Sequence, residues 1–100
     1  MAERRMFSKR IISSARFIQM PPSTQALYFH LGLNADDDGV VEAFTVMRLI
    51  GASEDELRIL SSKGLVTVLN NELVTYLNDW RENNKIRPDR KVNSIYKDLL

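Results

Sequence analysis

Residues 43–77, AFTVMRLIGASEDELRILSSKGLVTVLNNELVTYL, contain the pattern that decides the fold. Apolar side chains recur from Ala43 to Ile50 at the i, i+3, i+4, i+7 spacing of a single helix face, which predicts an amphipathic helix over 43–50. Gly51 is suited to end this helix, because glycine readily adopts the left-handed conformation that follows a last helical turn.

A second helix is predicted to begin almost at once. Ser53 and Glu56 have the S-x-x-E spacing of a capping box, and we expect a helix from Ser53 to Lys63 that buries Leu57 and Leu60. Two helices joined by a short turn that contains glycine form a helix-turn-helix unit.

Two runs rich in β-branched residues follow this helix pair, over 65–69 and 72–77. The residues between them, Asn70 and Asn71, tolerate the left-handed backbone that a tight hairpin turn requires. The predicted fold class is therefore α+β and mostly α, a winged helix-turn-helix with a C-terminal β-hairpin as its wing.

Upstream, the segment 24–34 is apolar on most sides and predicts a central, buried helix, with Ser23 as its N-cap after two prolines. Val40 and Val41 predict a short strand. The first dozen residues are expected to form an extended arm or a short strand, and a brief helix is expected over 14–19.

The acidic run at 36–39, Asp-Asp-Asp-Gly, has two interpretations. Aligned on a calcium-binding EF-hand loop, it would need a bidentate glutamate where the chain has Thr45. We therefore expect a turn that ends the central helix, in which Gly39 supplies a positive φ.

The sequence predicts one domain over 1–80 with a basic N-terminal arm. Residues 81–100 are expected to be a basic C-terminal extension, helical over 90–99, that links to a second domain absent from this chain. Trp80 closes the return strand and is expected to cover the core beneath the wing.

Charge is distributed unevenly along the chain, although its net value is only +1. Residues 1–16 carry five basic and one acidic side chain, and residues 81–100 carry six and three, whereas residues 17–80 carry three and nine. Basic ends around an acidic body predict an anionic partner such as nucleic acid, while the plainer interpretation is that the charged ends are simply solvated.

Composition argues against several other classes. The chain has no cysteine, no apolar run that could cross a bilayer and no apolar stretch after its charged N-terminus, so we expect a soluble, cytoplasmic protein without a disulfide or a thiolate metal site. No Gly-rich phosphate loop and no nucleophile–base pair is visible, and His30 is expected at the core or its boundary. We expect no enzyme activity, cofactor or metal.

Several blocks resemble a known family. They are Arg5 to Ile12, Met20-Pro21, Gln25 to Gly32, Ala35 to Gly39, Ile50 to Ser53, the Leu57/Leu60 pair, and the segment with Trp80, Asn83-Asn84, Ile86 and Asp89-Arg90. Together they resemble the N-terminal domain of phage replisome organisers, which are replication initiators related to the DnaD-like primosome proteins. The resemblance covers most of the chain, although residues 61–63 and 81–87 depart from the usual pattern.

The resemblance implies a winged-helix domain that binds double-stranded DNA at a phage origin. It also implies that the full-length protein recruits the host helicase-loading proteins through another region. The rival hypothesis is a protein-interaction module that forms homo-oligomers and binds little DNA, and it is favoured by apolar residues on both faces of the predicted hairpin.

Candidate DNA contacts come from the predicted recognition helix and from both basic ends. They are Arg4, Arg5, Lys9, Arg10, Arg58, Ser61, Ser62, Lys63, Arg87, Arg90 and Lys91. Arg58 could read guanine, or it could be a surface ion-pair partner of Glu54 at the i, i+4 spacing. The acids at 54–56 suit the helix dipole but would repel DNA phosphates.

Overall fold

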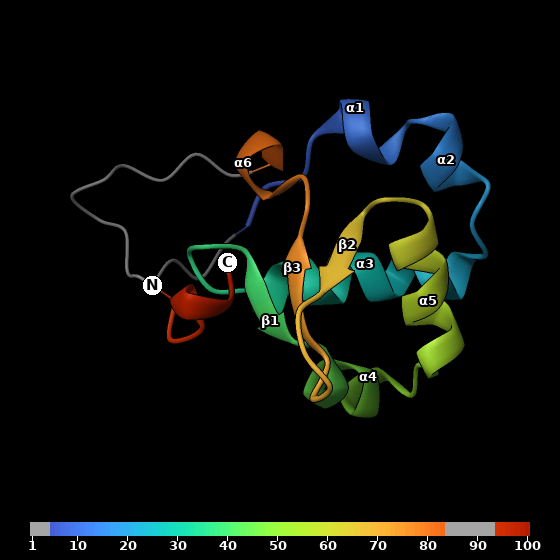
Figure 1. Cartoon of the computed structure of the whole chain (residues 1–100). Coiled ribbons are helices and arrows are strands. Elements are labelled where there is room, and N and C mark those ends of the chain that lie inside the picture. Colours follow the sequence, from blue (N-terminus) through green and yellow to red (C-terminus); the bar gives the residue numbers. More distant parts are fainter. Residues whose placement is uncertain (1–4, 84–93) are drawn as a thin grey trace.

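The computed structural model describes residues 5–83 and 94–100. It is a small α+β domain in which about half of the chain is helical and three short strands form an antiparallel sheet (Figure 1). The elements are α1 (Lys9–Ile12), α2 (Ala15–Ile18), α3 (Pro22–Asn34), β1 (Val40–Glu42), α4 (Ala43–Ile50), α5 (Glu54–Ser62), β2 (Val66–Val68), β3 (Val74–Leu77), α6 (Trp80–Asn83) and the 3-10 turn η2 (Lys97–Leu99).

The sheet has the strand order β1-β3-β2, so the hairpin strand β3 is central and β2 is an edge. Val41 and Val68 both pair with Thr75, from opposite sides of β3, and Val66 pairs with Leu77. This arrangement confirms the predicted strand at 40–41 and the predicted hairpin after α5, although β2 and β3 are shorter than the two runs in the sequence.

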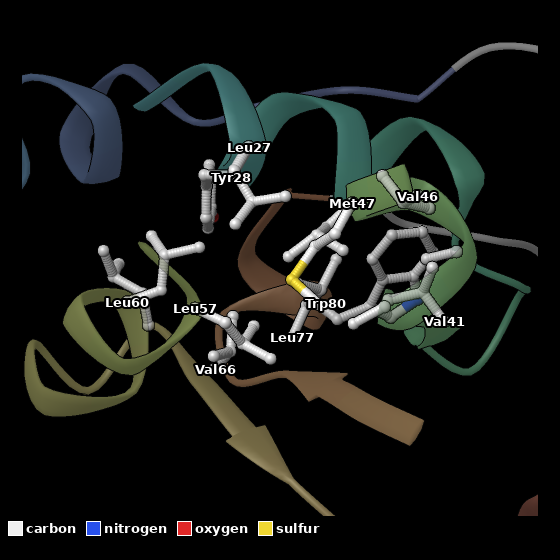
Figure 2. Close-up of a cluster of buried hydrophobic side chains, with 14 of the residues drawn as sticks. Leu27, Tyr28, Val41, Val46, Met47, Leu57, Leu60, Val66, Leu77 and Trp80 are labelled. Carbon is white, nitrogen blue, oxygen red and sulfur yellow. The ribbon is translucent and has the colours of Figure 1, made fainter. Parts of the chain in front are cut away.

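The core lies between α3 and the sheet, and α4 and α5 close it (Figure 2). Leu27, Tyr28 and Leu31 of α3 are almost completely buried, as are Leu60 of α5 and Leu77 of β3. The predicted helix is confirmed and packs one side into the core, but it is not enclosed on most sides, because Ala26 is exposed and Leu33 is 54% exposed.

The helix pair α4 and α5 is confirmed, together with its turn. Gly51 follows α4 with φ of 73°, and the N–H of Ala52 donates to the carbonyl of Met47 at 2.9 Å, which closes the last turn of the helix. Ser53 is the N-cap residue of α5, but its side chain makes no capping hydrogen bond, so the hydrogen bonding of the predicted capping box is not formed.

The N-terminal segment differs from its prediction. Residues 9–12 are helical rather than an extended arm or a strand, and α3 begins at Pro22, so that Ser23 lies inside the helix instead of capping it. Proline at the first helical position is favourable because its fixed φ suits the helix and no N–H is needed there. The short helix expected over 14–19 is confirmed as α2.

None of the helices in the described part of the chain has the length and apolar character needed to cross a membrane.

Candidate nucleic-acid interface

Arg5 is not part of a surface arm. Its guanidinium donates to the carbonyl of Ala35 at 2.8 Å and to Asp37 Oδ1 at 3.2 Å, and it lies over the ring of Trp80 at 5.1 Å from the centroid. The Arg5 and Asp37 side chains are each only 2% exposed. A guanidinium enclosed in this way cannot reach a phosphate, so the prediction that Arg5 contacts DNA is wrong.

The residues after Arg5 are also packed against the domain. The ring of Phe7 lies 5.0 Å from that of Phe29 and 5.9 Å from that of Tyr28, and Ile11 is buried. Apolar side chains on the segment 5–12 therefore fix it along α3. Lys9 and Arg10 remain exposed on α1, so two members of the predicted basic arm do lie at the surface.

The acidic turn after α3 is a structural junction. Asp36 Oδ1 accepts hydrogen bonds from the backbone N–H of Asp38 and of Val40, and Asp38 Oδ2 accepts one from the N–H of Ser94. Asp37 Oδ1 accepts a hydrogen bond from the Arg5 guanidinium. The turn predicted at the end of the central helix is confirmed, and its three carboxylates hold the turn itself, the N-terminal segment and the C-terminal segment.

Trp80 has the role expected from the sequence. It is buried, and its indole N–H donates to the carbonyl of Asp37 at 3.0 Å. His30, by contrast, is exposed on α3, so the expectation of a core or boundary histidine is wrong.

Arg58 on the predicted recognition helix α5 takes part in an exposed ion-pair cluster. Its guanidinium pairs with Asp55 and lies 3.7 Å from Glu54 Oε2. All three side chains are largely exposed, so these pairs contribute little to stability and can exchange for another partner at small cost. The ion pair with Glu54 is therefore present, and contact of Arg58 with DNA stays a prediction.

The C-terminal end of α5 offers a different surface. Ser61 and Ser62 are exposed, and the Ser62 hydroxyl donates to the carbonyl of Ile59 while its lone pairs stay accessible. Lys63 is half-buried just after the helix. Phosphate contacts can be made by such hydroxyl and ammonium groups without base reading.

Arg16 was not among the predicted contacts, yet it joins three elements at this end of α5. It donates to the carbonyl of Lys63 at 3.0 Å and forms a 3.1 Å ion pair with Asp79. The side chain is still 40% exposed. In the sequence, Arg16 could be recognised only as one more member of the N-terminal basic cluster. Its two partners could not be predicted, because Lys63 and Asp79 lie 47 and 63 positions further along the chain.

The two edges of the domain differ in their balance of charge. Figure 1 shows α1, α2 and α6 along the upper edge, where α5 ends, and α4 with the loop of the hairpin at the lower edge, where α5 begins. The described basic residues of the upper elements are Lys9, Arg10, Arg16, Lys63 and Arg81. The lower elements carry the acids of the first turn of α5 and Glu72 of the hairpin loop, together with the exposed Arg48 of α4. Asp79 lies at the upper edge, where it pairs with Arg16.

Four predicted contacts, Arg4, Arg87, Arg90 and Lys91, lie outside the described residues, as do positions 90–93 of the helix expected over 90–99. In the described remainder of that segment the expectation is wrong, because residues 95–96 form a turn and Lys97–Leu99 form a single 3-10 turn, η2, instead of an α-helix. Comparisons with protein-family models, with curated proteins and with solved structures find no match.

Proposed function

We propose that the chain is a DNA-binding winged-helix domain of a phage-type replication initiator. The observation that carries the proposal is the order of elements: helix α3, strand β1, the helices α4 and α5, then the hairpin of β2 and β3, in which β3 also pairs with β1. This is the order in which a winged helix places its recognition helix beside its wing. The resemblance of the sequence to phage replisome organisers supplies the biological role.

The DNA-binding face that we propose is the upper, basic edge rather than the start of α5. Lys9 and Arg10 on α1 and Arg81 on α6 are exposed there, and Arg16 connects α2 to the carbonyl at the end of α5. Such an arrangement would hold the DNA backbone through phosphate contacts, with Ser62 at the end of α5 beside it.

The acidic start of α5 supports this orientation. Glu54, Asp55 and Glu56 occupy the first turn, where their charges favour the helix dipole but repel phosphates. A duplex that approached from the lower edge would also meet Glu72 and a hairpin tip without basic side chains. Origin DNA would therefore be held at the opposite edge, while the full-length protein recruits the helicase loader through another region.

A salt titration of duplex binding tests the proposal. We expect the whole chain to bind an origin-like duplex at low salt, with the logarithm of affinity falling linearly as salt rises. The double variant Lys9→Gln/Arg10→Gln should lower the slope by about 0.9 for each phosphate that the variant no longer neutralises. Arg58→Gln is the control, because it removes one positive charge from α5 near the acidic first turn, and it should leave the slope unchanged.

Two results would contradict the proposal in different ways. No detectable duplex binding at low salt would reject the DNA-binding role. Binding that depends on Arg58 but not on Lys9 and Arg10 would keep the role and reject the upper edge as its location.

A further inference from the structure

A shallow groove lies between α5 and the hairpin and extends along α5 from Glu54 to Ser61. It is lined by Glu54, Leu57, Arg58, Ser61, Val68 and Leu73 and has a volume of about 140 Å³. An apolar protein cavity of about 150 Å³ accepts one benzene molecule, so the groove is large enough for a single aromatic or branched aliphatic side chain.

Leu73 forms one wall of the groove in a conformation that leucine rarely adopts. Within residues 5–83 and 94–100 it is the one residue other than glycine with a positive φ, at 64°. The left-handed conformation costs an ordinary L-residue about 1–2 kcal/mol. Glycine or asparagine would adopt this positive φ at lower cost, so we attribute the presence of leucine to the contacts of its side chain.

The loop holds Leu73 in this position through the backbone and one amide side chain. The N–H of Leu73 donates to the carbonyl of Asn70, and its own carbonyl accepts from Ala43 at the start of α4. Asn70 Oδ1 accepts from the N–H groups of Glu72 and Val74. The side chain is thereby kept half-buried, partly against the core and partly facing the groove.

The surroundings of the groove are acidic. Glu54 is part of the lining, Asp55 follows it on α5, and Glu72 precedes Leu73 on the hairpin side. The one positive charge on the lining, Arg58, is already paired with two of these acids. An apolar floor beneath a negative rim is complementary to a basic segment that carries one apolar side chain.

We propose that this groove binds a basic segment of a partner protein, which inserts one apolar side chain between α5 and the hairpin. Phosphates are repelled from this edge and attracted to the opposite one. The domain can therefore hold DNA and a protein partner at the same time, each on its own edge.

Methyl NMR of the whole chain tests the proposal, with the peptide Lys-Lys-Phe-Lys-Lys as probe. We expect saturable shifts of the Leu57, Val68 and Leu73 methyl groups. The peptide with serine in place of phenylalanine should bind at least about tenfold more weakly, because the buried ring is lost. The peptide with glutamates in place of lysines should not bind.

Two variants separate binding from folding. Leu73→Gly removes a groove wall and relieves the backbone strain, so peptide binding should fall about tenfold while the melting temperature changes by only a few degrees. Val68→Lys places a positive charge in the groove on the edge strand β2, where lysine is well tolerated, and should weaken binding similarly. Leu49→Ala, exposed on α4 outside the lining, is the control and should bind as the parent chain does.

Four outcomes would overturn the proposal. They are the absence of methyl shifts, equal binding of the acidic peptide, shifts of the same methyl groups that depend on the concentration of the chain alone, and shifts of the same methyl groups when duplex DNA is added without peptide. The third would assign the groove to a second copy of the chain, and the fourth would assign it to nucleic acid.

Discussion

Replacing Asp37 with asparagine removes one charge from the ion pair that attaches the N-terminal segment to the domain. Both side chains of this pair are 2% exposed, and the Arg5 guanidinium also lies over Trp80. Removing one partner of a buried pair leaves an uncompensated charge and costs about 3–5 kcal/mol. A domain of this length has a total stability of only about 5–15 kcal/mol, so the variant should lose a large fraction of it.

Urea denaturation followed by circular dichroism measures this loss, and thermal melting gives a second value. For a chain of about this size, each kcal/mol shifts the melting temperature by about 4–8 °C, so Asp37→Asn should melt at least about 12 °C lower. Arg58→Gln breaks an exposed pair and should cost less than about 1 kcal/mol. The double variant Arg5→Met/Asp37→Asn should be more stable than the sum of its single variants predicts, because it leaves no buried charge unpaired.

Equal effects of Asp37→Asn and Arg58→Gln would refute this reasoning. Such a result would mean that solvent screens the Arg5–Asp37 pair as fully as it screens a pair on the open surface of α5.

Three further predictions concern the backbone and one tyrosine. Gly39 has φ of 81° and a Cβ there would lie 2.5 Å from the Trp80 ring, so Gly39→Ala should cost about 3 kcal/mol in chemical denaturation. Gly51 has φ of 73° and open space around it, so Gly51→Ala should cost only about 1 kcal/mol; equal costs at the two sites would contradict the packing of Trp80. Partial burial, followed by the charge and hydrogen bond of Glu42, raises the pKa of Tyr96 above its ordinary 10.0. Because the folded state retains this proton, its stability should fall as pH rises past 10.0 toward the folded pKa. Glu42→Gln should bring the Tyr96 midpoint, followed by NMR, back toward 10.0, and an unmoved midpoint would show that Glu42 does not act on it.

The middle of the chain was predictable because its signals are local. The spacing of apolar residues over 43–50, the glycine that follows and the β-branched hairpin strands each depend on neighbours within a few positions. Their elements appear at nearly the predicted bounds. The capping box shows the limit of this reasoning, because the S-x-x-E spacing marks where α5 begins but not whether the Ser53 hydroxyl makes its hydrogen bond.

The N-terminal segment was mispredicted because its structure depends on distant residues. Arg5 is separated from Asp37 by 32 positions, and Arg16 from Asp79 by 63, and no local spacing reveals such pairs. A cluster of basic residues therefore looked like one surface arm. The folded chain divides it into Arg5 inside the domain, Arg16 at a junction, and Lys9 and Arg10 on the surface.

The positions of these basic residues also determine the charge at the two ends of α5. The acids of its first turn stabilise the helix because they lie next to the partial positive charge of its dipole. Arg58 is then drawn into pairs with two of them, which leaves the beginning of α5 negative. At the other end, the Arg16 guanidinium donates a hydrogen bond to the carbonyl of Lys63, so a positive charge lies where the helix dipole is negative. Both ends of α5 thus follow the same electrostatic rule, and under the two proposals the side-chain charges that stabilise the helix would place DNA at its C-terminal end and a basic protein segment at its N-terminal end.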